Sequence, residues 1–183
     1  MKTIPLILAS SSPRRRQLLL DAGYQFTVLQ PQDINEDQLP SEPPELLVRR
    51  LALAKAQSCA RQLSLASDSV PQASGMEPRS SLVVGCDTVA ECSGQILGKP
   101  TDKGDARRML ALLRGREHRV LSGLCLWHLP TDQHRLEIDI TRLIMARLRS
   151  AMRAGSRISL RKITTGRMRS STAFRATRRR TRI

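Results

Sequence analysis

Residues 6–15 read LILASSSPRR, and this stretch sets the fold class that the rest of the chain continues. The apolar run Leu6–Ala9 predicts a short buried strand. Ser12 is a good helix N-cap, and Pro13 suits the first helical position because its missing N–H costs nothing there. A helix is therefore predicted over residues 14–22. A strand that leads directly into a helix is typical of an α/β fold.

The remainder of the chain alternates strands and helices in the same way. Thr101 is the expected N-cap of the last helix, and the Ser-, Pro- and Gln-rich segment 64–81 predicts a surface loop. This order predicts an α/β fold in which helices flank a sheet. The further strands are expected over residues 26–29, 82–85 (with 89–92 extended), 95–97, 119–126 and 136–145, and the further helices over 44–63 and 102–113.

The charge is distributed unevenly along the chain. The 183 residues carry 31 Lys plus Arg against 16 Asp plus Glu, a formal net charge of +15. Residues 1–145 hold 18 basic and 16 acidic side chains, whereas residues 146–183 hold 13 basic and no acidic ones. The sequence therefore predicts a folded domain over 1–145 and a basic, Arg-rich tail over 146–183 that buries little surface.

Three interpretations of this tail stay open. An arginine-rich arm could neutralise nucleic-acid phosphates, which would make the chain a non-catalytic nucleic-acid-binding protein. A solvated, disordered tail is at least as plausible. The absence of acids and the ratio of 12 Arg to one Lys also resemble translation in a shifted reading frame.

Composition excludes several classes of protein. The apolar runs are far too short to cross a bilayer, and the first residues lack the apolar stretch of an export signal. The four cysteines form no C-x-x-C pair, and the three histidines are not at zinc-ligand spacing. A reduced, cytoplasmic setting is the simplest expectation.

Polar and positively charged side chains gather at the start of the first predicted helix. Free backbone N–H groups and the positive end of the helix dipole occur there, next to the hydroxyls of Ser10 and Ser12. Arg14 and Arg15 add guanidinium groups that bind phosphate oxygens. These features outline a phosphate site, although a capped helix with surface arginines is equally common.

Two carboxylates follow predicted strands. Asp87 comes after the apolar run 82–85, where an acid either forms a turn or acts as a metal ligand or base. Glu36 lies in an acidic loop, where a solvated acid is the plainer interpretation. If the two converge, they could hold one Mg²⁺, which prefers oxygen ligands and substrate phosphates. Lys55 and Lys99 could bridge phosphate oxygens, although each alone is typical of a surface lysine.

Five short motifs occur in a fixed order along residues 4–145. They read SSSPRR at 10–15, DINE at 33–36, RLALAKA at 50–56, GCDT at 85–88 and LGKP at 97–100. They resemble the S-x-S-P-R-R, D-x-x-E, R-L-A-x-x-K-A, G-A-D-T and L-x-K-P motifs of the Maf nucleotide pyrophosphatases. The resemblance implies a Maf/inosine triphosphatase-like mixed sheet flanked by helices.

The resemblance also implies an activity. Maf proteins hydrolyse a nucleoside triphosphate between its α and β phosphates, and they are thought to remove non-canonical or surplus nucleotides. By resemblance, Asp87 activates water, and Glu36 and Asp87 hold a divalent cation, Mg²⁺ or Mn²⁺. Arg14 and Thr88 match the branch that resembles dTTP and UTP hydrolases. Whether the protein forms a homodimer is left open. The residues expected to bind substrate are Ser10, Ser12, Arg14, Arg15, Lys55 and Lys99.

The chain departs from the family at its end. Neither the K-A-G-x-x-G-I-Q-like segment nor the V-G-L-P-like segment of the family occurs in residues 146–183. We therefore expect the C-terminal part of the fold to be incomplete and substrate binding to be weaker. An inactive, truncated relative is the remaining alternative.

Overall fold

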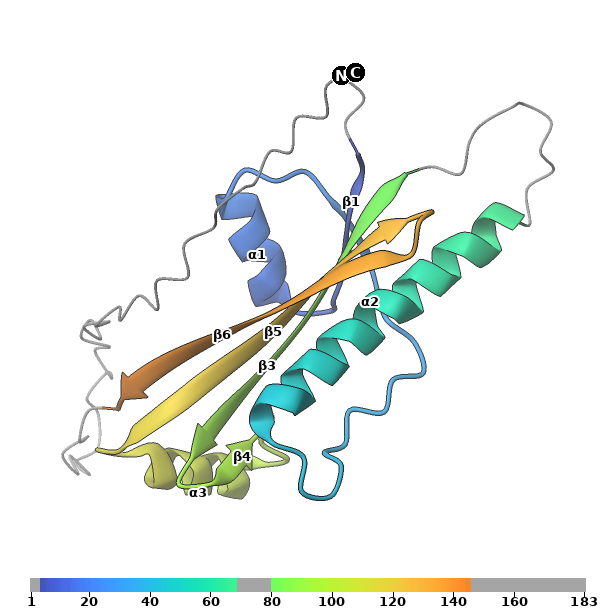
Figure 1. Cartoon of the computed structure of the whole chain (residues 1–183). Coiled ribbons are helices and arrows are strands. Elements are labelled where there is room, and N and C mark those ends of the chain that lie inside the picture. Colours follow the sequence, from blue (N-terminus) through green and yellow to red (C-terminus); the bar gives the residue numbers. More distant parts are fainter. Residues whose placement is uncertain (1–3, 69–79, 146–183) are drawn as a thin grey trace, which may run out of the picture. The chain divides into compact units, whose positions relative to one another are not determined.

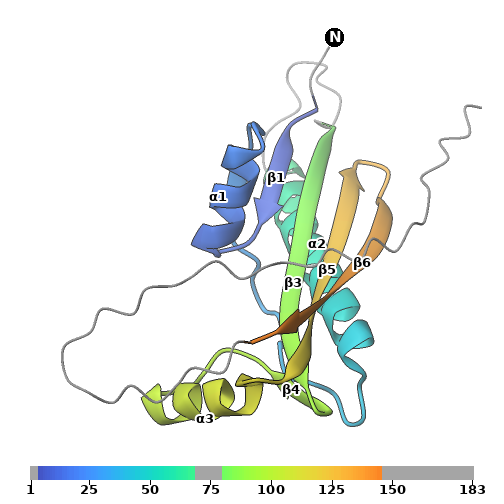
Figure 2. The same ribbon diagram turned by 90° about the vertical axis from the view of Figure 1, so that its left-hand side faces the viewer.

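A six-stranded mixed sheet with three helices forms the described part of the chain, which confirms the predicted α/β class. The computed structural model describes residues 4–68 and 80–145. Helix α2 lies along one face of the sheet (Figure 1), and α1 lies beside β1 on the other side (Figure 2). The predicted domain boundary at 145 and the expected incomplete C-terminal part concern residues 146–183, outside the described residues. In chain order the elements are β1 (Leu6–Ala9), α1 (Pro13–Asp21), β2 (Thr27–Leu29), α2 (Pro44–Asp68), β3 (Ser81–Cys92), β4 (Gln95–Leu97), α3 (Lys103–Leu113), β5 (Glu117–Leu129) and β6 (Gln133–Ile144).

The strand order places the short N-terminal strand β1 inside the sheet, between β2 and β3. It is β2-β1-β3-β5-β6, with β4 paired to β3. β1 runs parallel to β2 and β3, whereas the other pairs are antiparallel. Pairing between β1 and β3 ends where Ala9 lies opposite Gly85. Beyond this point the chain after β1 turns into α1, while β3 continues.

The prediction that a strand ends at Gly85 is wrong. β3 runs without a break from Ser81 to Cys92, because β5 pairs with it along this length and satisfies its backbone groups. Asp87 therefore lies within a strand, opposite Gly123 of β5. It also lies just past the end of the β1 pairing, so the carboxyl end of β1 still marks the place of the predicted site.

The core lies between the sheet and α2. Successive side chains of a strand point to opposite faces, and the odd-numbered residues of β3, from Ser81 to Val89, are the buried ones on the α2 side. Gly85 and Gly123 let α2 approach closely, since a Cβ on either would collide with the α2 backbone. The buried apolar side chains that α2 supplies include Leu47, Val48, Leu51, Ala52, Ala56, Cys59 and Ala60.

Other predicted bounds need correction. α2 continues to Asp68, into the segment predicted as a loop from residue 64. The N-cap of α3 is Asp102, not Thr101, because Asp102 has extended dihedral angles and its Oδ1 accepts the Asp105 N–H at 2.8 Å. β5 and β6 are longer than predicted because they pair with each other almost throughout. No helix within the described ranges is long and apolar enough to span a bilayer.

Candidate functional site

The start of α1 is built as the sequence predicts. Ser12 is the N-cap, and its Oγ accepts the N–H of Arg15 at 3.5 Å. Ser10 is buried, and its Oγ accepts the N–H of Ser12 at 3.2 Å. Arg15 folds back over this turn, and its Nη1 donates to the Ser10 Oγ at 3.4 Å. The turn therefore presents a helix N-terminus and one guanidinium on the same side, which suits an anionic ligand.

Three charged side chains from distant segments meet beside this turn. Lys55 of α2 is buried, and its Nζ donates to Oδ1 of Asp87 at 2.7 Å. The same Nζ lies 2.7 Å from Oε1 of Glu36. The two carboxylate oxygens can thus be no farther apart than twice that distance. The predicted convergence of the two acids is present, with an ammonium group between them.

The positive side chains around Glu36 lower the pKa of its carboxyl group. The Lys55 ammonium, which donates a hydrogen bond to Glu36, holds the pKa of that carboxyl below its ordinary value. Partial burial opposes this effect, and the charges of Lys99 and Arg15 reinforce it from farther away. Glu36 therefore stays ionised and available as an oxygen ligand down to lower pH than a free glutamate.

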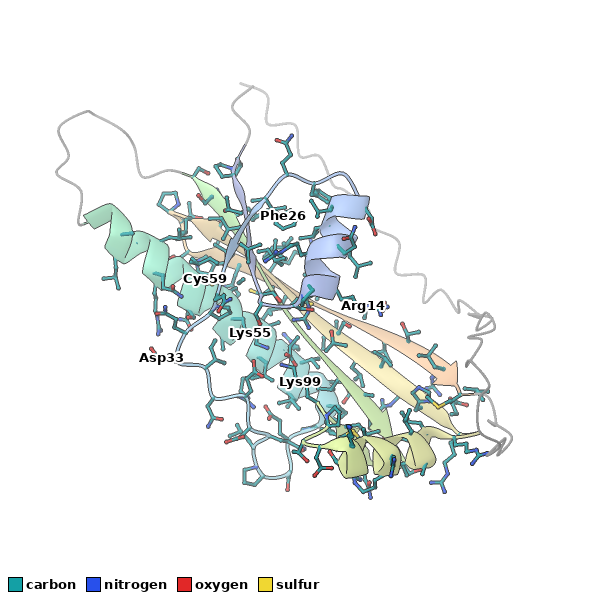
Figure 3. The ribbon with its side chains drawn as sticks, turned by 180° about the vertical axis from the view of Figure 1, so that it is seen from behind. Arg14, Phe26, Asp33, Lys55, Cys59 and Lys99 are labelled. Atoms are coloured by element: carbon teal, nitrogen blue, oxygen red, sulfur yellow. The ribbon has the colours of Figure 1, made fainter. Side chains whose placement is uncertain are left out.

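A cleft of about 1080 Å³ contains this cluster. Arg14 is the one predicted site residue outside its lining. It is exposed at the N-terminal end of α1, and Figure 3 labels it together with Lys55 of α2 and Lys99 of the segment after β4. The predicted site residues that do line the cleft are Ser10, Ser12, Arg15, Glu36, Lys55, Asp87, Thr88 and Lys99.

Arg15 is held from a second side by the sheet. Its Nη2 donates to the Thr88 Oγ1 at 3.2 Å, and this hydroxyl lies 3.1 Å from the Oγ of Ser122 on β5. Thr88 thus fixes the direction of the guanidinium toward the cleft. Sequence reasoning missed Ser122, because only the pairing of β3 with β5 brings it opposite Thr88.

The segment that carries Glu36 has no regular secondary structure, and α2 holds it in place. Ser58 exchanges two hydrogen bonds with the backbone of Gln32, each of 2.9 Å. Arg50 forms an ion pair with Glu42, with 2.7 Å between Nε and Oε1. Residues 30–43 are thereby tied to α2 near both of their ends.

Acid is expected to loosen this segment through Glu42. The Arg50 hydrogen bond holds the pKa of Glu42 below its ordinary value of 4.5, so the pair stabilises the fold above that pH and loses its effect as the pH falls through the lowered value. In urea unfolding, Glu42→Gln should be less stable than wild type at neutral pH, and the gap should shrink at values well below 4.5. The matched control is Glu137→Gln, which removes an exposed acid of β6 and should change stability little. A gap for Glu42→Gln that stays constant into acid would contradict the prediction.

All four cysteines are free thiols. Burial raises the pKa of Cys59 and of Cys125 to about 11, so neither forms a reactive thiolate at neutral pH.

The donor set fits a hard divalent cation for which water and phosphate oxygens supply most of the ligands. Among the described residues, no three His, Cys, Asp or Glu side chains gather into a complete metal cage. Mg²⁺, however, is usually bound by one or two carboxylates together with substrate phosphates. Glu36 and Asp87 supply two carboxylates at one point of the cleft.

In open α/β sheets, ligands bind beyond the carboxyl ends of the strands. The charged cleft at the carboxyl end of β1 lies at such a place. The chain belongs to the Maf-like protein family, whose sequence profile matches residues 5–154. This match confirms the family resemblance that the five motifs indicate.

Three curated relatives share one name. The chain is 38% identical over 149 residues to a dTTP/UTP pyrophosphatase of Citrifermentans bemidjiense, an alignment that covers 81% of this chain and 69% of the relative. It is 42% identical over 127 residues to one of a Geobacter species, covering 69% and 58%. It is 46% identical over 125 residues to one of Shewanella denitrificans, covering 66% and 57%. The chain thus spans 57–69% of the lengths of these relatives.

These relatives favour the pyrophosphatase interpretation over nucleic-acid binding through the tail. The tail itself falls on residues 146–183, outside the described residues.

Proposed function

We propose that this protein is a nucleoside triphosphate pyrophosphatase that converts a nucleoside triphosphate to the monophosphate and pyrophosphate. The observation that carries the proposal is the meeting of the Glu36 and Asp87 carboxylates at the Lys55 Nζ, each at 2.7 Å, inside a cleft. The same cleft is lined by Arg15 and Lys99. Its size and mixed charges suit a polyphosphate, and the names of the relatives support the same reaction.

The positive groups bind the triphosphate at different parts of the cleft. The N-terminus of α1 and the guanidinium of Arg15 form one anion-binding end, with Ser10 and Ser12 shaping the turn. Lys99, on the segment after β4, supplies a point charge on another side of the cleft. Together they neutralise the phosphate chain and hold it in line with the carboxylates.

Asp87 is the proposed proton acceptor. Lys55 donates to its Oδ1 and fixes the carboxylate, and the other oxygen takes the proton from the attacking water. The water oxygen forms a bond to the α-phosphorus, and the bond from that phosphorus to the α–β bridging oxygen breaks. Pyrophosphate leaves with the bonding electron pair, and Arg15 and Lys99 stabilise the charge that develops on it.

Glu36 and Asp87 are also the proposed ligands of a divalent cation, Mg²⁺ or Mn²⁺. When bound, such an ion would neutralise charge on the phosphate oxygens. The two carboxylates then balance the added positive charge, which otherwise would repel the buried Lys55. This arrangement agrees with the lowered pKa of Glu36, since a ligand carboxyl must be ionised.

The preferred substrates proposed here are dTTP and UTP, on the names of the relatives. Thr88 would contribute by aiming Arg15, to which its hydroxyl is bonded. Arg14 stays a predicted specificity residue at the exposed start of α1. The cytoplasmic setting and a homodimer likewise stay predictions.

The deciding experiment is an assay of pyrophosphate release from a panel of triphosphates. With Mg²⁺ or Mn²⁺ present, dTTP and UTP should give pyrophosphate faster than ATP, GTP and CTP, and EDTA should stop the reaction. A metal-supplemented protein that releases pyrophosphate from none of them would refute the proposal. That result would support the inactive-relative alternative.

A further inference from the structure

Burial does not determine the position of Glu36. Its side chain is 54% exposed, and the segment around it has no helix or strand to fix its backbone. An exposed glutamate on such a segment would ordinarily sample many positions. Something else must keep its carboxylate at the Lys55 ammonium, beside Asp87.

Arg50 binds the backbone on both sides of Glu36. Its Nη1 donates to the carbonyl oxygen of Asn35 at 3.4 Å, and its Nη2 donates to the carbonyl oxygen of Asp37 at 2.8 Å. These are the residues immediately before and after Glu36. Two donors of one planar group therefore hold the carbonyl groups of the two residues that flank Glu36.

Glu42 in turn fixes the guanidinium. It accepts from Nε of Arg50 at 2.7 Å and from Nη2 at 2.8 Å, a two-point pair that sets the plane of the group. The Glu42 side chain is only 7% exposed, and its Oε2 also accepts the N–H of Leu39. Glu42 thus has little freedom to carry Arg50 away from the segment.

We infer that Arg50 is a positioning residue that holds Glu36 at the cation and phosphate site through the carbonyl groups of Asn35 and Asp37. The inference rests on the proposed function for its catalytic consequence. Arg50 is not itself a lining residue of the cleft. It reaches the lining through the carbonyl group of Asp37, so it acts on the site through the segment that carries Glu36. Arg50 and Lys55 belong to the same helix, α2. This helix therefore holds both the backbone around Glu36 and the Glu36 carboxylate.

The first test measures the backbone directly. In the metal-free full chain, ¹⁵N relaxation of the Asn35, Glu36 and Asp37 amides should report an ordered backbone in wild type and nanosecond motion in Arg50→Gln. Arg50→Lys keeps the charge but cannot supply the fork of donors, and it should loosen the same amides. Amides as ordered in both variants as in wild type would overturn the inference.

The second test measures catalysis in a double-mutant cycle. Arg50→Gln should lower kcat/KM for dTTP by roughly 10–100-fold, as loss of a supporting contact behind a ligand typically does. In a Glu36→Gln background the same change should cost little, because its target is already gone. An equal loss in both backgrounds would mean a general structural role and would overturn the inference.

The matched control is Arg119→Gln. Arg119 is exposed to nearly the same extent, 32% against 31% for Arg50, and it also bridges two segments, through Glu45 and Glu91. The Arg119→Gln variant should keep the amides around Glu36 ordered. Its kcat/KM should stay within about twofold of wild type, as is usual for surface substitutions. If wild type hydrolyses no triphosphate, the proposed function fails, and the relaxation measurement still decides the role of Arg50.

Discussion

Asp87→Asn is expected to reduce pyrophosphate release by roughly 10²–10⁴-fold, the range that a general base contributes. Asparagine has nearly the same shape as aspartate, and its Oδ1 can still accept the hydrogen bond from Lys55. Its amide cannot take a proton from water, and it is a poorer ligand for a divalent cation. Lys55 keeps its ion pair with Glu36, so the buried ammonium is not left alone.

The measurement is the initial rate of pyrophosphate release from dTTP, with circular dichroism and thermal unfolding to show that the variant is folded. The matched control is Asp139→Asn, which removes an exposed acid of β6 on the edge strand of the sheet. That control should retain the wild-type rate. If Asp87→Asn keeps more than about a tenth of the rate, the role of Asp87 as general base is wrong.

Local signals in the sequence were sufficient to predict β1 and the start of α1. Ser12 and Pro13 mark the start of α1, because both act through the helix turn that immediately follows them. The charged residues that gather in the cleft were also predictable, since the family motifs that carry them occur in order. What those residues contact was not predictable in the same way.

The remaining features depend on pairing between distant segments. Asp87 lies within a strand because β5 pairs past the end of β1, and the two strands are far apart in the sequence. Arg50 was visible as the first residue of a motif, but its partners at 35, 37 and 42 are set by an irregular segment with no periodicity. Gly85 and Gly123 carry no side chain to signal that α2 packs against them.

Gly123→Ala is expected to destabilise the protein by about 3 kcal/mol or more, at the upper end of the usual cost of overpacking a core. A Cβ at this position would collide with the carbonyl group of Val48, which is backbone and cannot rotate away. Val48 is fully buried in α2, so the whole helix would have to move. Urea unfolding followed by circular dichroism measures the loss of free energy.

Gly98→Ala is the matched control, because a Cβ at residue 98 meets nothing within 4 Å. It should leave the free energy of unfolding unchanged or raise it slightly, since alanine lowers the entropy of the unfolded chain.

Gly123→Ala has a second consequence, because α2 also carries Lys55 and the glycine lies opposite Asp87 in the sheet. Moving α2 away from β5 should separate the Lys55 ammonium from the Asp87 carboxylate, so the folded fraction should also lose activity. A Gly123→Ala protein as stable as the Gly98→Ala control would contradict the prediction, because it would show that α2 and β5 have room for the added Cβ.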